Sequence, residues 1–109
     1  MTISPDPMVQ AEQCFLNIAM ALQAAGSSVD DIVRVHYIFP NKLDFEPCWP
    51  VFKKYLAIAK PAATMIVAGL LDDAMKLEIE VTARLISEFE RTLERPDQID
   101  KSRERLSTF

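Results

Sequence analysis

The sequence contains few of the residues that build metal and redox sites. Among its 109 residues there are one histidine, two cysteines and two glycines. A single histidine cannot form a histidine-based metal cluster, and Cys14 and Cys48 lack both metal-ligand and CxxC spacing. We therefore expect no metal and no cofactor. The cysteines are expected to be reduced, half-buried thiols in a cytoplasmic protein, with a disulfide as the less favoured alternative.

Long apolar runs and an excess of basic residues are also absent. The apolar runs fall far short of the roughly 20 residues that a membrane-spanning helix needs, and no basic region followed by an apolar core opens the sequence. A formal net charge of −4 opposes non-specific binding to nucleic acid, which requires clustered lysine and arginine. We expect neither a membrane nor a nucleic-acid partner.

Half of the residues are hydrophobic, which together with the length predicts one small globular domain. A first helix is signalled at both ends, because Asp6 can cap it, Pro7 suits its first turn and Gly26 can end it in the left-handed conformation. Its apolar face consists of residues at helical spacing, namely Ala11, Cys14, Phe15, Ile18, Leu22 and Ala25. Ser28 and Asp31 then indicate a short capping turn.

A strand is predicted over residues 32–39, which are rich in β-branched and aromatic side chains. Strict alternation would place on one face Val33, Val35, Tyr37 and Phe39, and on the other Ile32, Arg34, His36 and Ile38. A second helix follows, capped by Asp44, and Pro50 predicts that this helix begins late or bends. Its apolar contacts are expected from Phe45, Trp49, Phe52 and Leu56, with Val51 and Tyr55 as alternatives.

Residues 61–84 are typical of a β-hairpin, two strands joined by an acidic turn. In the second strand the apolar residues alternate with polar ones, and they are Leu77, Ile79, Val81 and Ala83. Three strands would make a small sheet with an exposed edge. The densely charged residues 87–109 predict a short helix around Phe89 and Leu93, and a mobile tail beyond Pro96.

Several segments, taken in order, resemble the RidA (YjgF) family of enamine and imine deaminases. They are the Gln-Ala-Glu-Gln-Cys run from Gln10, the run from Ala25 to Val35, Asp44-Phe45, Pro61-Ala62 and the strand containing Glu78-Ile79-Glu80. The resemblance implies an α+β fold of the RidA/chorismate-mutase-like kind, in which two helices pack on one face of a mixed β-sheet. Residues 1–86 would form this single domain, and residues 87–109 a charged C-terminal tail.

Family members carry several strands before the first helix, whereas only residues 1–6 precede it here. The sheet is therefore expected to be shortened by the missing N-terminal strands. The favoured explanation is a true start upstream of Met1. A natural fragment, or compensation by assembly, are the alternatives.

The resemblance also implies a homotrimer with small-molecule pockets between its subunits. In the family's Pro-Ala-Arg-Thr pattern the arginine grips the substrate carboxylate through a two-pronged hydrogen bond, and here Ala63 stands at that position. The ligand-binding positions that the resemblance implies are Ala63, Thr64, Met65 and Trp49. Glu80 matches the carboxylate that positions the hydrolytic water, and it is the candidate catalytic residue.

We therefore expect a small-metabolite pocket rather than a standard 2-aminoacrylate deaminase. One alternative is an imine or enamine deaminase that uses another arginine, such as Arg34, and a second is a non-enzymatic binding or regulatory module. Whether the chain is an enzyme stays open; if it is, we expect a hydrolase. The family labels of translation inhibitor and endoribonuclease are least favoured, because the chain is acidic and its sequence shows no histidine-based acid–base pair. His36 is expected to make a structural hydrogen bond or to lie exposed.

Overall fold

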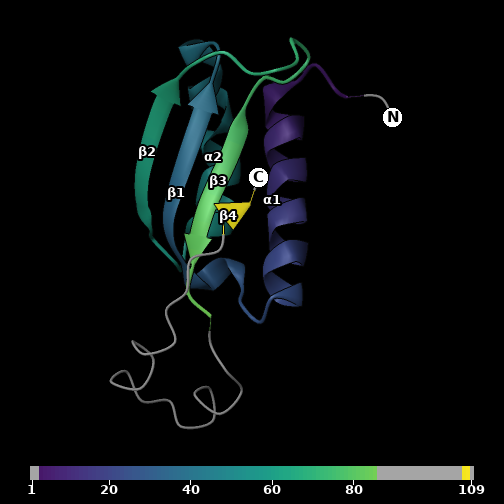
Figure 1. Ribbon diagram of the computed structural model, residues 1–109. Coiled ribbons are helices and arrows are strands. Elements are labelled where there is room, and N and C mark those ends of the chain that lie inside the picture. Colours follow the sequence, from purple (N-terminus) through teal and green to yellow (C-terminus); the bar gives the residue numbers. More distant parts are fainter. Residues whose placement is uncertain (1–2, 86–106, 109) are drawn as a thin grey trace, which may run out of the picture.

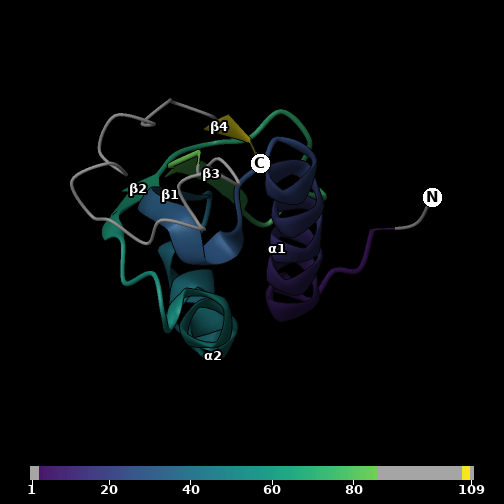
Figure 2. The same cartoon turned by 90° about the horizontal axis from the view of Figure 1, so that it is seen from below.

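Two helices lie side by side on one face of a small β-sheet (Figures 1 and 2). The computed structural model describes residues 3–85 and 107–108. The helices are α1 (Pro7–Ala24) and α2 (Phe45–Leu56), and the strands are β1 (Ile32–Phe39), β2 (Ala62–Val67), β3 (Glu78–Ala83) and β4 (Ser107–Thr108). Short 3₁₀ turns, Val29–Asp31 and Lys42–Asp44, precede β1 and α2. The predicted α+β fold, with two helices on one face of a mixed sheet, is confirmed.

The strand order in the sheet is β2-β1-β3-β4, with β1 parallel to β2 and antiparallel to β3 (Figure 1). The predicted hairpin of residues 61–84 is therefore wrong, because β1 lies between its two strands. The connection from β1 to β2 runs through α2, and a helical crossover of this kind is what parallel pairing requires. Residues 68–77 then carry the chain past the end of β1 to its other side.

The alternation predicted for the last strand is confirmed. The side chains of Ile79, Val81 and Ala83 are buried, and so is Leu77 just before β3. In β1 the alternation fails at one point, because the ladder with β3 shifts register between Ile32 and Arg34. This bulge leaves Ile32 2% exposed and Val33 37% exposed, so Val33 does not belong to the buried face as predicted.

Both ends of α1 are as the sequence predicts. Asp6 Oδ1 accepts a hydrogen bond from the Met8 backbone N–H at 2.9 Å, and Pro7 occupies the first turn. At the other end Gly26 has a φ of 87°, the left-handed conformation in which glycine most often ends a helix. Local signals were sufficient here because each one acts within a single turn.

Ser27 and Asp31 join the turn after α1 to the residue that follows β3. The 3₁₀ turn Val29–Asp31 confirms the predicted short turn, but the Ser28 side chain makes no capping hydrogen bond to the backbone and its hydroxyl donates instead to the Asp31 carboxylate at 2.8 Å. The Ser27 hydroxyl, which is buried, donates to the Arg84 carbonyl at 2.7 Å, and the Arg84 N–H donates to the Asp31 carbonyl at 3.0 Å. These contacts fix where β3 ends relative to α1.

The start of α2 differs in detail from the prediction. Asp44 occupies the N-cap position, but its side chain makes no capping hydrogen bond. Asn41 Oδ1 instead accepts from the Leu43 N–H at 3.0 Å and caps the preceding 3₁₀ turn. The helix begins at Phe45 and includes Pro50, so it does not begin late.

Aromatic side chains form the centre of the core, between the helices and the sheet. The Phe52 ring stacks on Tyr37 with centroids 4.2 Å apart and meets Phe15 at 6.0 Å in an edge-on arrangement. Burial raises the pKa of the Tyr37 hydroxyl above its ordinary value. Trp49 was predicted among the core contacts of α2 but is 49% exposed, whereas Phe52 is buried in the core.

The two cysteines are free thiols, so the disulfide alternative is wrong. Cys14 is half-buried as predicted, and burial raises its pKa. Cys48, also expected to be half-buried, is instead fully buried, and burial raises its pKa to about 11. Since the thiolate is the reactive form, neither thiol is activated as a nucleophile.

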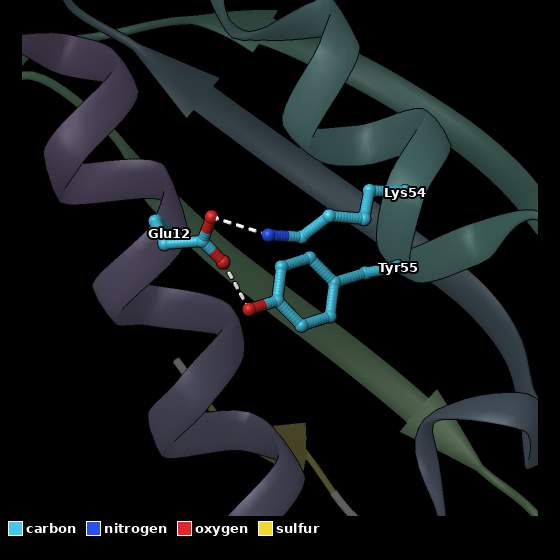
Figure 3. A network of polar contacts seen from close by, with 3 residues as sticks. All are labelled: Glu12, Lys54 and Tyr55. Carbon is cyan, nitrogen blue, oxygen red and sulfur yellow. Dashed lines mark hydrogen bonds and ion pairs between the residues drawn. The ribbon is translucent and has the colours of Figure 1, made fainter.

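A polar contact joins the two helices at their outer surface (Figure 3). Glu12 of α1 accepts hydrogen bonds from the Lys54 ammonium at 2.7 Å and from the Tyr55 hydroxyl, both on α2. These contacts lower the pKa of Glu12 and raise those of Lys54 and Tyr55. The Tyr55 ring also stacks on the Phe15 ring, with centroids 4.9 Å apart, so Tyr55 takes part in both the polar contact and the core.

Most of the predicted C-terminal tail, including the expected helix around Phe89 and Leu93 and the expected mobile segment, lies outside the described residues. Within it, Ser107 and Thr108 form β4 and pair antiparallel with Thr82 and Val81 of β3. In the part of the chain that the structure describes, no helix is long and apolar enough to cross a membrane.

Candidate functional site

An apolar pocket of about 270 Å³ lies at the β2 side of the sheet, where α2 and the segment after it cover the strands. Apolar residues make up most of its lining, with two lysines among them. The lining residues are Val35, Tyr37, Trp49, Phe52, Lys53, Leu56, Ala57, Lys60, Pro61 and Ala63. Pockets that take small metabolites are commonly of this kind, largely apolar with a few polar groups that orient the ligand.

Strand register decides which of the predicted site residues face this pocket. Ala63 pairs with Val35, and Met65 pairs with Tyr37, so both belong to the helix-facing side of β2. Trp49 approaches the same pocket from α2. The structure therefore brings Trp49 and Ala63 together, with Met65 on the same face one step further along the strand.

Thr64 and Glu80 lie on the opposite, helix-free face of the sheet. Both are direct neighbours of His36, Thr64 in the parallel ladder with β2 and Glu80 in the antiparallel ladder with β3. The sheet therefore separates Glu80 from the pocket formed by Trp49 and Ala63. Within a single chain the predicted catalytic residue does not reach the predicted ligand-binding residues.

The structure also shows a pair that the sequence analysis missed. His36 Nδ1 lies 3.6 Å from Glu80 Oε1, and the side chains are 29% and 50% exposed. The sequence analysis did not anticipate that a carboxylate lies beside the only histidine of the sequence. Alternation placed each residue on a strand face, but the pair becomes visible only when β3 is known to lie beside β1.

Two lysines in the pocket lining were likewise missed. Lys53 comes from α2, and Lys60 stands just before β2 with a φ of 46°, a conformation that is uncommon for a residue with a side chain. The Lys60 N–H donates to the Leu56 carbonyl at 3.0 Å, which ends the helical turns after α2. A positively charged group beside an apolar cavity favours a ligand that combines an apolar body with a negative charge.

Among the described strands β2 is an edge strand, and the pocket adjoins it. All six residues of β2 are exposed, although several are large and apolar, among them Met65, Ile66 and Val67. An exposed apolar edge strand presents unpaired backbone groups and normally has a partner. The open side of the pocket is thus next to the surface of the described chain that most favours association.

A second hollow, of about 210 Å³, lies at the other end of the sheet and is polar. Its lining includes Asp44, Asp72, Asp73 and Lys76. Among the described residues, no three histidine, cysteine, aspartate or glutamate side chains are placed to hold a metal ion.

The fold and the pocket define a small α+β domain with two helices on a mixed sheet and a ligand-sized cavity at an open sheet edge. Residues 1–85 match the protein family described as Endoribonuclease L-PSP. The chain belongs to this family, which is the RidA/YjgF family that the sequence resembles.

Named relatives agree with this assignment. A RutC family protein of Pyrococcus horikoshii is 31% identical over 74 residues, which are 68% of this chain and 59% of that protein. A 2-iminobutanoate/2-iminopropanoate deaminase of Dermatophagoides farinae is 28% identical over 71 residues, 65% of this chain and 56% of the relative. The chain thus spans less than two thirds of the length of these relatives.

Solved structures show the same fold. A crystal structure of a YjgF/YER057c/UK114 family member from Mycobacterium tuberculosis superposes with a TM-score of 0.69 and 22% identity, covering 72% of this chain and 67% of that one. At this identity the likeness concerns the arrangement of helices and strands, not the site.

Proposed function

We propose that this chain is a RidA-like protein that binds a small metabolite in the apolar pocket between α2 and β2. The observation that carries the proposal is the juxtaposition of Trp49 and Ala63 in a cavity of about 270 Å³. Such a volume accommodates a small organic molecule rather than a macromolecule. The lining favours an aromatic or branched aliphatic body with an anionic group directed to Lys53 or Lys60.

The pocket lacks the arginine with which deaminating relatives of the RidA family bind a substrate carboxylate. Ala63 occupies that position and has no hydrogen-bonding group, and a lysine offers a point charge rather than a planar two-pronged donor. We therefore propose that the chain does not turn over 2-aminoacrylate at the rate of a standard deaminase. Ligand binding, or hydrolysis of a different small molecule, is the proposed activity.

The pocket is proposed to be completed by neighbouring subunits of a homotrimer. The exposed apolar strand β2 beside the pocket supports association at this edge. Association would also allow Glu80 of one subunit to approach the pocket of another, whereas within its own chain Glu80 lies across the sheet. In this arrangement Glu80 would position water for a hydrolytic reaction, and Thr64 would enter the site in the same way.

A second candidate is an imine deaminase in which Arg34 replaces the missing arginine. Arg34 is exposed and belongs to the helix-free face, on the same side as His36 and Glu80. The shared strand face supports this candidate, which needs no contribution from Ala63. The cytoplasm remains the proposed location, on the basis of the two free thiols.

Binding can be measured through Trp49, because it is the only tryptophan in the sequence. Titration with phenylacetate is expected to change its fluorescence in a saturable way, and phenylacetamide, which is similar in shape but uncharged, is expected to bind more weakly. An unchanged spectrum across the phenylacetate titration would refute the pocket as a site for aromatic anions.

Turnover and assembly need separate experiments. Ammonia release from freshly generated 2-aminoacrylate is expected to match the rate without protein, and rapid release would refute the claim made from Ala63. If ammonia release is rapid, Arg34→Ala tests the second candidate, since unchanged activity in that variant excludes Arg34.

Light scattering is expected to give the mass of three copies, and a monomer would contradict the intersubunit pocket.

A further inference from the structure

The apolar pocket at Trp49 has two positively charged side chains in its lining and, among the described residues, no carboxylate. The two charged residues are Lys53 and Lys60. We propose that this pocket takes an aryl phosphate monoester, a dianion whose phosphate is bound jointly by Lys53 and Lys60. The inference rests on the function proposed above and names its ligand class, because that function leaves open how many charges the ligand carries and which lysine it meets.

The protein itself does not neutralise these two lysines. Lys54, which is next to Lys53 in the sequence, is paired with Glu12 of α1 at 2.7 Å. In the described part of the chain neither Lys53 nor Lys60 lies within ion-pair distance of a carboxylate. Two like charges beside one cavity repel each other, and a ligand with a single negative charge balances only one of them. A dianion balances both, so the pocket favours a double charge although the whole chain carries a net charge of −4.

The backbone of Lys60 is a separate reason to assign this residue to a ligand. Its φ is 46°, and among the described residues it is the only one other than glycine with a positive φ. Its N–H donates to the Leu56 carbonyl at 3.0 Å, and glycine is the usual residue where a helical segment ends in this way. A residue with a side chain is strained there, and strain of this kind is concentrated at functional sites. Local stability therefore does not explain why this position is a lysine.

The position of Lys53 can be explained by the helix alone, since a lysine in the last turn of α2 interacts favourably with the helix dipole. Its part in the proposal rests on the pocket lining that it shares with Lys60. The two lysines thus make different predictions. Loss of the Lys60 ammonium should affect the ligand without cost to the fold, whereas loss of Lys53 should affect both.

The chemistry of the lining selects a phosphate on an aromatic body. A lysine ammonium is a compact point charge with three donors, which suits the tetrahedral array of phosphate oxygens, whereas a planar carboxylate is matched best by the fork of an arginine. The aromatic part of the lining comes from Tyr37, Trp49 and Phe52, whose rings favour contact with another ring. A cavity of about 270 Å³ leaves room for one substituted ring.

The test follows the fluorescence of Trp49 in the full chain during titration with ligands that share a phenyl ring. At about pH 8 phenyl phosphate is a dianion, because the second pKa of a phosphate ester is about 6. Methyl phenyl phosphate is a monoanion of nearly the same shape. We expect phenyl phosphate to bind about fivefold more tightly, the upper range for one additional exposed charge contact. Phenylmalonate, a dianion with two planar carboxylates, is expected to bind less tightly than phenyl phosphate.

Lysine variants assign the preference to the two residues. Lys53→Met and Lys60→Met are each expected to lower the affinity for phenyl phosphate about fivefold and to bring it close to that for methyl phenyl phosphate. Lys42→Met is the matched control, because Lys42 is exposed and lies outside the pocket lining, and it is expected to keep the affinity of the unmodified chain. Lys60→Gly removes the ammonium and relieves the backbone strain. Its urea midpoint should not fall, so weaker binding by this variant is not a loss of the fold.

The proposal is overturned if phenyl phosphate binds no more tightly than methyl phenyl phosphate, or if phenylmalonate binds as tightly as phenyl phosphate. Full affinity in Lys60→Gly, or an equal loss in Lys42→Met and Lys53→Met, overturns it as well. Failure of this inference is distinguishable from failure of the pocket itself. Saturable binding of phenylacetate without a preference for the dianion refutes the inference alone, whereas no response to any of these aromatic anions refutes the pocket.

Discussion

Trp49 of α2 and Ala63 of β2 line the same apolar pocket, although they come from different elements on either side of a helix-to-strand connection. This relationship follows from the parallel pairing of β1 with β2, which places Ala63 beside Val35 under the helix. Ala63 thus lines a cavity that has two lysines in its lining. A charge introduced at this position would enter the cavity directly.

Ala63→Arg is expected to strengthen the binding of phenylacetate about tenfold, because a hydrogen bond to a charged group contributes roughly 1.5–3 kcal/mol. Trp49 fluorescence measures the dissociation constant. Ala63→Leu is the control, since it fills similar space without a charge, and it is expected to weaken binding. Equal tightening by Leu would show that contact area rather than charge determines affinity.

Glu12→Gln is expected to destabilise the fold in a pH-dependent way. Because the folded-state pKa of Glu12 is lowered by Lys54 and Tyr55, its carboxylate stabilises the fold above the unfolded pKa, about 4.3. This contribution is lost as the pH falls through the lowered folded-state value. The variant should therefore be less stable at about pH 7, and the difference should shrink as the pH falls below the unfolded pKa, as urea unfolding can measure.

Lys54 and Tyr55, the partners of Glu12, determine the alkaline limit of the pH range over which this contact stabilises the fold. Their pKa values are raised in the folded state, so the part of the contact that depends on protonated Lys54 and Tyr55 is present below their unfolded pKa values and is lost as the pH rises through the folded ones. A destabilisation by Glu12→Gln that stays constant from acid to alkaline pH would contradict this account and assign the effect to packing.

Phe52→Ala is expected to lower the free energy of unfolding by about 3–5 kcal/mol, because it leaves a cavity among stacked aromatic rings. Leu71→Ala also removes apolar side chain, about half as much, but at a fully exposed position, and it should change stability by less than about 0.5 kcal/mol. Urea unfolding of the two variants compares them. A small loss for Phe52→Ala would mean that the helices do not pack on the sheet as described.

Gly26→Ala is expected to cost about 1 kcal/mol, although the added methyl group would meet no atom within 4 Å. The cost comes from the φ of 87°, which a residue with a side chain rarely adopts. Gly69→Ala is the matched control, because it also meets open space but without a left-handed φ, and it should be neutral or slightly stabilising. Equal effects at both positions would exclude the backbone explanation.

Features that depend on a single turn could be predicted from the sequence. Asp6, Pro7 and Gly26 mark the ends of α1 because capping acts over a few residues. The alternation of β3 predicted its buried face, because one side of the strand packs against the helices. Family resemblance supplied the α+β arrangement, which these local patterns alone do not determine.

Features that depend on which strands are neighbours could not be predicted. The hairpin interpretation failed because two strands that are consecutive in the sequence need not pair, and β1 takes the place between them. The pairing of His36 with Glu80, and the separation of Glu80 from Trp49, follow from the same register. Val33 was misplaced because a bulge changes the alternation by one residue, and nothing local in the sequence indicates where a bulge occurs.

The position of β1 between β2 and β3 has a consequence for how the chain folds. β1 is made first, yet both of its neighbours follow α2 in the sequence, and the strand that closes its second side is the later of the two. During synthesis both edges of β1 therefore stay unpaired until β2 and β3 have been made. Pairing over such long sequence separations slows folding, and it prolongs the time for which aggregation-prone strands are exposed. β3 has the clearest alternation of apolar and polar residues in the sequence. It can join the sheet only by pairing with β1, which is synthesised earlier.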